Sequence, residues 1–112
     1  MSAFLQALAL MMALADDGAT SEIPACQFDE RYDTPSKQRS HRRPISPADY
    51  RGKSAAQLRA RFGQPECRGP DKWRYVYPPG CTDWRTVVTL WLSRGRVSRV
   101  NIVDHYTGQH CR

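Results

Sequence analysis

The sequence predicts an α+β fold: two short helices packed on one face of a three-stranded antiparallel meander sheet, preceded by an extended N-terminal arm. Three observations predict this fold. Helix-start and helix-stop residues flank two segments between residues 46 and 65. Three segments rich in β-branched and aromatic residues follow, joined by short links. The chain has 112 residues, which is room for one domain.

Residues 1–15 have the pattern of a secretory signal peptide. They contain no charged side chain, they end in Ala13-Leu14-Ala15, and Asp16 follows directly. A short apolar run before an A-x-A pattern is typical of a signal peptide and its cleavage site. The run is shorter than the ~20 apolar residues that cross a bilayer. We therefore expect export, with a final location in the periplasm or outside the cell.

Residues 16–44 are polar and contain few large apolar side chains. Such a segment buries too little surface to offset the entropy lost on ordering, so we expect an extended basic arm before the domain formed by residues 45–112. The arm contains a basic run, with Lys37, Arg39, Arg42 and Arg43. This run is either a solvated linker or an electrostatic contact with an acidic partner or anionic lipid headgroups.

The two helices are predicted from their capping residues. Ser46 followed by proline starts a turn or short helix over Pro47–Arg51, which ends at a glycine. Ser54 and Gln57 form a capping box for a second helix, Ala55–Phe62, which Gly63 and a nearby proline end.

Three strands are predicted, over residues 72–77, 84–92 and 97–106, with a tight turn between the second and third. Because side chains alternate along a strand, each strand has one side facing the helices and one facing away. The helix-facing side carries Trp73, Tyr75, Tyr77, Val88, Leu90, Leu92, Val100 and Ile102. The opposite side carries Lys72, Arg74, Val76, Arg85, Val87, Thr89, Trp91, Arg99, Asn101 and Val103. This opposite side mixes cations with apolar residues, which is typical of a contact surface and not of a core.

Several motifs in this region occur in a known order. They are Gly52-Lys53-Ser54-Ala55-Ala56-Gln57-Leu58, Phe62-Gly63-Gln64-Pro65, Trp73-Arg74-Tyr75 and the pair Val97 and Val100. This pattern, over about residues 47–104, resembles the SmpA/OmlA (BamE-like) family of small periplasmic or outer-membrane domains. The resemblance implies two helices on a three-stranded antiparallel sheet. The chain lacks the family's lipid-attachment cysteine, and it is also similar to one repeat of the β-lactamase inhibitor proteins.

The four cysteines are Cys26, Cys67, Cys81 and Cys111. An even number in a short exported chain predicts two disulfides, with three possible connectivities. The strand order alone allows Cys81 to pair with Cys111, because both lie at the same end of the meander. The resemblance to the inhibitor repeat instead implies Cys67–Cys81, which leaves Cys26–Cys111. No pair has the close spacing of a zinc site, so we expect no metal.

No catalytic pattern is present. The histidines are His41, His105 and His110, and the neighbouring Asp104 and His105 point to opposite faces of a strand. His110 beside Cys111 has no thiolate partner if that cysteine is bridged. We therefore expect neither an enzyme nor a cofactor.

The predicted function is a non-catalytic binding module whose partner is another protein, one of the cell envelope. The expected contact residues lie on the side away from the helices: Arg74, Trp91, Arg99 and Asn101. The alternative is an electrostatic binder of anionic lipid or nucleic acid through Lys37, Arg39, Arg42 and Arg43. The formal charge of +6 permits this, but no nucleic-acid motif accompanies the charge. The sequence indicates neither the partner's identity nor the oligomeric state.

Overall fold

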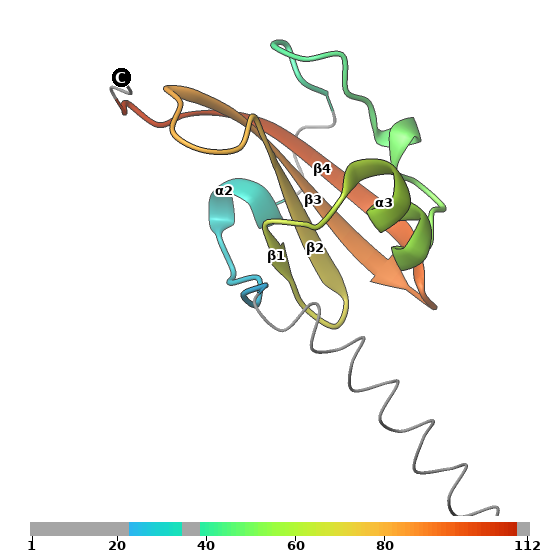
Figure 1. Ribbon diagram of the computed structural model, residues 1–112. Helices are drawn as coiled ribbons and strands as arrows, with labels where there is room; N and C mark the ends of the chain where they lie inside the picture. The colour runs from blue at the N-terminus through green and yellow to red at the C-terminus, as the bar shows by residue number, and fades with distance from the viewer. Residues whose placement is uncertain (1–22, 35–38, 110–112) are drawn as a thin grey trace, which may run out of the picture.

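The structure, a computed structural model, describes residues 23–34 and 39–109 (Figure 1). The predicted signal peptide, Lys37, His110 and Cys111 lie outside the described residues. Within them, no helix combines the length and the apolar character that crossing a membrane requires.

The sheet is antiparallel and has four strands, not the predicted three. The strands are β1 (Cys67–Arg68), β2 (Lys72–Tyr77), β3 (Trp84–Ser93) and β4 (Arg96–Tyr106). They lie in the order β1-β2-β3-β4, so the predicted meander of β2, β3 and β4 is confirmed. The additional strand β1 pairs its two residues with Arg74 and Trp73 of β2. Two residues are too short to show an alternating pattern, which is why sequence analysis missed β1.

One α-helix and one short 3-10 helix lie on one face of this sheet, as predicted (Figure 1). Helix η1 spans Pro47–Asp49 and α3 spans Ala55–Phe62. The predicted capping box starts α3. The backbone N–H of Gln57 donates to Ser54 Oγ at 3.3 Å, and the backbone N–H of Ser54 donates to Gln57 Oε1 at 2.8 Å. Because two otherwise unpaired backbone donors are satisfied, the helix begins where the sequence indicates.

The core lies between these helices and the sheet. Tyr50, which follows η1, stacks on Phe62 of α3 with ring centroids 4.5 Å apart. Leu58 of α3 is fully buried against the strands. The buried cluster comprises Tyr50, Leu58, Trp73, Tyr75, Val88, Leu90, Val97, Val100 and Ile102. The predicted division of the sheet into two faces is therefore confirmed.

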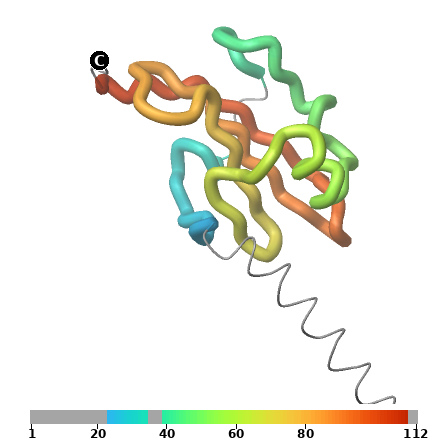
Figure 2. Tube along the Cα trace, in the orientation of Figure 1, coloured from blue at the N-terminus to red at the C-terminus, as the bar shows by residue number. Residues whose placement is uncertain are grey.

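The described part of the N-terminal arm is not extended throughout. Residues Glu30–Asp33 form a short helix, α2, whose first turn is capped when Arg31 N–H donates to the side chain of Asp29. Figure 2 shows residues 23–34, blue to cyan, on the side of the sheet away from α3. Residues from Ser40 onward bond to Asp104 and Thr86, whose side chains lie on the α3 side. The two described segments of the arm thus lie on opposite faces of the sheet.

The disulfide connectivity differs from the prediction. Cys26 of the arm is bonded to Cys67 of β1, 41 residues later in the sequence. The predicted pairs Cys67–Cys81 and Cys26–Cys111 are therefore both wrong. Cys67 lies in β1, where the returning arm brings Cys26 within bonding distance. Cys81 is not a free thiol.

Candidate functional site

The side of the sheet away from α3, called here the outer face, carries the predicted contact residues. It comprises Lys72, Arg74, Val76, Arg85, Val87, Thr89, Trp91, Arg99, Asn101 and Val103. Residues 24–34 of the arm lie on this face, so the described protein covers part of the surface that the sequence assigns to a partner.

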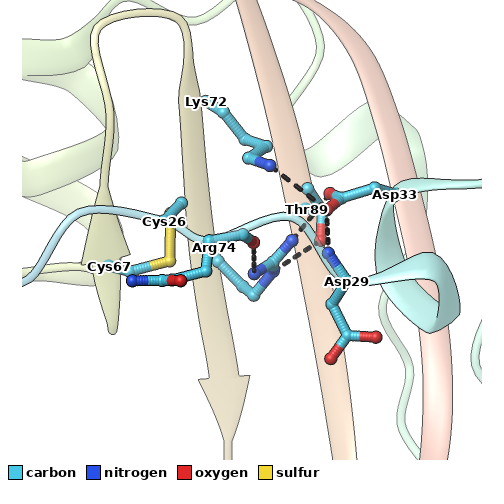
Figure 3. Close-up of a disulfide and its surroundings, with 8 residues drawn as sticks. Cys26, Asp29, Asp33, Cys67, Lys72, Arg74 and Thr89 are labelled. Atoms are coloured by element: carbon cyan, nitrogen blue, oxygen red, sulfur yellow. Dashed lines mark hydrogen bonds and ion pairs between the residues drawn. A yellow bond between two sulfur atoms is a disulfide. The ribbon is translucent and has the colours of Figure 1, made fainter.

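Arg74 lies under the arm, and each of its three side-chain nitrogens has a partner (Figure 3). Its Nη2 donates to Asp33 Oδ1 at 2.7 Å, its Nε to Thr89 Oγ1 at 3.1 Å, and its Nη1 to the carbonyl of Gln27 at 3.2 Å. Lys72 donates to the other oxygen of Asp33 at 3.1 Å. Because one carboxylate pairs with two cations of the sheet, this cluster anchors α2 to β2.

Asp33 is held in its charged form. Burial alone raises the pKa of this carboxyl, but the hydrogen bonds from the backbone of Asp29 and from Lys72, with the charge of Arg74, outweigh it and lower the pKa below 3.8. The side chain of Asp33 is only 4% exposed, so its pairing is little weakened by solvent.

Asn101, on β4, also binds helix α2. Its side-chain amide donates to the carbonyls of Tyr32 at 2.6 Å and Thr34 at 3.2 Å, and the residue is 1% exposed. These carbonyls belong to the end of α2, where backbone acceptors lack helical partners. Of the four predicted contact residues, Arg74 and Asn101 therefore bind the arm of their own chain.

Trp91 and Arg99 are the other two predicted contact residues, and they lie together beyond the arm. They are opposite each other on β3 and β4, and the Arg99 guanidinium carbon is 4.3 Å from the centroid of the indole. Both residues are partly exposed. Arg99 Nη2 is enclosed by the protein without a hydrogen-bond partner, and no carboxylate among the described residues forms an ion pair with Arg99. The pair is thus an aromatic and cationic surface whose charge is not neutralised by the part of the chain that the structure describes.

A second contact between the arm and the sheet surrounds His105. Arg31 Nη1 lies 3.2 Å from His105 Nε2, and the ring of Tyr32 meets the imidazole edge-on at 5.8 Å. Burial, together with the charges of Arg31 and Arg85, lowers the pKa of His105. A neutral imidazole leaves Nε2 free to accept the hydrogen bond from Arg31.

The basic residues of the arm are also placed, apart from Lys37, which lies outside the described residues. Arg39 is exposed. The guanidinium carbon of Arg42 lies 4.4 Å from the Trp84 ring centroid. Arg42 and Arg43 line a pocket of about 350 Å³ together with Pro78 and Trp84. Asp104 fixes this segment, because it accepts from Ser40 Oγ at 2.7 Å and from the backbone N–H of His41 at 2.8 Å.

Sequence analysis missed the arm as an occupant of the outer face. The signal that could have found it is charge complementarity: Asp29 and Asp33 are spaced like neighbours on a helix, and the predicted outer face carries several cations. Among the described residues, no group of three or more histidine, cysteine, aspartate or glutamate side chains is arranged to hold a metal ion.

The fold and this face define a small, disulfide-bonded α+β protein whose sheet binds its own N-terminal arm on the face opposite the helices. A scan against protein-family models, a search of curated proteins and a search of solved structures each found no match.

Proposed function

We propose that this chain is an exported, non-catalytic protein-binding module of the periplasm or cell envelope, and that Trp91 and Arg99 form the centre of its contact surface. The observation that carries the proposal is the stacked pair itself: the Arg99 guanidinium carbon lies 4.3 Å from the indole centroid, and no carboxylate in the described part of the chain pairs with Arg99. Tryptophan and arginine are the residue types most enriched where truncation costs a complex most of its affinity.

The surroundings of the pair indicate what the partner presents. Lys72 lies opposite Trp91 on β2, as Arg99 does on β4, so a cation flanks the indole on each side. A complementary surface carries a carboxylate for Arg99 beside an apolar group for Trp91. The proposed location is supported by the disulfide Cys26–Cys67, since disulfides persist in oxidising compartments. The sequence motifs that resemble SmpA/OmlA domains favour the same location.

Affinity capture from native envelope extract tests the proposal, with Trp91→Ala compared against wild type. Trp91 lies outside the buried core cluster, so the variant should fold. Tyr106→Ala is the matched control, because Tyr106 is an exposed aromatic at the other end of β4. Once a captured protein is purified, Trp91→Ala should weaken its binding by about 2 kcal/mol or more, or about 30-fold in Kd, whereas Tyr106→Ala should not.

Capture of the same proteins, with equal affinity, by wild type and Trp91→Ala would contradict the assignment of this surface. The alternative is binding of anionic lipid through Arg39, Arg42 and Arg43, two of which line a pocket beside Trp84. The same samples separate the two functions, because binding to anionic vesicles would fall steeply with added salt and would not respond to Trp91→Ala.

A further inference from the structure

A pocket of about 370 Å³ lies between the arm and the outer face, away from Trp91 and Arg99. Cys67 and Arg74, both labelled in Figure 3, are among its lining residues. Its volume is within the range of pockets that hold small molecules in proteins, which begins at about 300 Å³.

The floor of the pocket is apolar. Val76 of β2 and Val87 of β3 are directly opposite each other in the sheet and both line it. Pro24 and Ala25 of the arm supply further apolar surface, and the ring of Tyr32 closes another part of the wall. An apolar portion of a ligand would therefore displace water from an apolar surface on more than one side.

Two guanidinium groups line the pocket, and they differ in how their charges are balanced. Arg74 forms an ion pair with Asp33. The acceptors that the described residues offer Arg85 are neutral: its Nη2 lies 3.3 Å from the carbonyl of Gly80 and 3.5 Å from Gln109 Oε1. Its Nε is enclosed by the protein without a partner, and no carboxylate of the described residues forms an ion pair with it. Within residues 23–34 and 39–109, Arg85 is thus a partly dehydrated cation without a counter-charge, which makes an anion in the pocket favourable.

Glu66 limits the charge that the pocket accepts. This residue lines the same pocket and is exposed, so its carboxylate adds negative charge at the rim. One carboxylate on the ligand gains from Arg85, whereas a second would be repelled by Glu66.

We propose that this pocket binds a monocarboxylate with a short apolar body, its carboxylate on Arg85 and its apolar part on Val76 and Val87. The ligand is either a free small acid or the C-terminal carboxylate of a peptide whose last residue is apolar, since both present the same chemistry. This site is separate from the surface formed by Trp91 and Arg99, so the two proposals fail independently.

Calorimetric and NMR titration of the oxidised protein with 3-phenylpropanoate tests the inference, up to millimolar ligand. The uncharged 3-phenylpropanamide and the cationic 3-phenylpropylamine should not bind measurably. N-acetyl-glycyl-phenylalanine, with a free C-terminus, and its C-terminal amide form the second arm. Binding of the small acid identifies a free acid as sufficient, and binding of the peptide acid alone identifies a chain terminus; either result supports the site.

Arg85→Gln should weaken binding of the acid by at least about tenfold, because it removes the cation that the carboxylate contacts. Arg51→Gln is the matched control: it removes the same charge at an exposed position that does not line the pocket. Val76→Thr is nearly isosteric and keeps Arg85, and it should also weaken binding because it makes the floor of the pocket polar. In the wild type, NMR should show contacts between the ligand and the methyl groups of Val87. Absence of binding by both carboxylates, equal binding of acid and amide, or an unchanged Kd in Arg85→Gln would overturn the proposal.

Discussion

Asp33→Asn should release the arm from the outer face. The substitution keeps the shape of the side chain and removes the negative charge that pairs with Arg74 and Lys72, whose contacts with Asp33 are 2.7 Å and 3.1 Å. The side chains of Asp33 and Arg74 are 4% and 9% exposed, so Arg74 would remain as a buried cation without its partner. Removing one partner of a buried ion pair costs about 3–5 kcal/mol.

The expected loss is about 3 kcal/mol, the lower end of that range, because α2 can detach locally and let Arg74 reach water. Urea unfolding followed by tryptophan fluorescence measures the global part of this loss. Hydrogen exchange at the amides of Asp33 and Thr34, which bond to Asp29 and Glu30 within α2, measures the local part. Glu30→Gln is the matched control, since Glu30 is exposed on the same helix and should change stability by no more than about 0.5 kcal/mol.

The wild type and Asp33→Asn should also differ in their response to acid. The pKa of Asp33 lies below 3.8 in the folded protein, so its contribution to stability is present above pH 3.8 and is lost as the pH falls through the lower folded value. This acid-dependent loss should be absent from the variant. Equal stability and equal exchange in Asp33→Asn and Glu30→Gln would refute the reasoning that a buried ion pair holds the arm.

Two further outcomes are expected. Replacing Cys26 and Cys67 together by serine should destabilise the protein by about 4 kcal/mol, because the disulfide closes a loop with a sequence separation of 41 residues. Mass mapping of the unreduced wild type should give the pairs Cys26–Cys67 and Cys81–Cys111. A Cys67–Cys81 peptide would contradict this connectivity. Burial raises the pKa values of Tyr50, Tyr75 and Tyr77 above 10.0. Their contribution to the free energy of unfolding should therefore be fully present below pH 10.0 and fall as the pH rises further. An ultraviolet titration in which these three tyrosines ionise near pH 10 in the folded protein would be inconsistent with their burial.

Elements with local signals could be predicted from the sequence. Ser54 and Gln57 define the start of α3 because capping is decided within four residues, and the alternation of apolar residues assigned Leu90 and Ile102 to the core because each strand has one buried face. The same alternation placed Trp91 and Arg99 on one face of the sheet, but their direct pairing depends on a β-bulge between Trp91 and Leu92, which the alternation does not reveal.

Features that depend on contacts between distant segments could not be predicted in this way. Strand β1 exists because Cys67 pairs with Arg74, and no pattern within two residues reveals that partner. Helix α2 is too short to be stable alone, and it is held by Arg74 and Asn101 from other parts of the fold. The disulfide pairing also depends on a distant contact, because Cys26 lies beside Cys67 only when the arm returns to the sheet.

The arm also changes how the sheet behaves toward other chains. An unpaired strand edge invites pairing with a neighbouring molecule and is a common origin of aggregation. Here Arg68 of β1 donates its backbone N–H to Pro24 of the arm at 2.8 Å, and at the start of β4 Val97 exchanges backbone hydrogen bonds with Gly52 and Lys53. Both borders of the sheet are therefore partly occupied by the chain's own backbone, which should disfavour edge-to-edge association of one molecule with another.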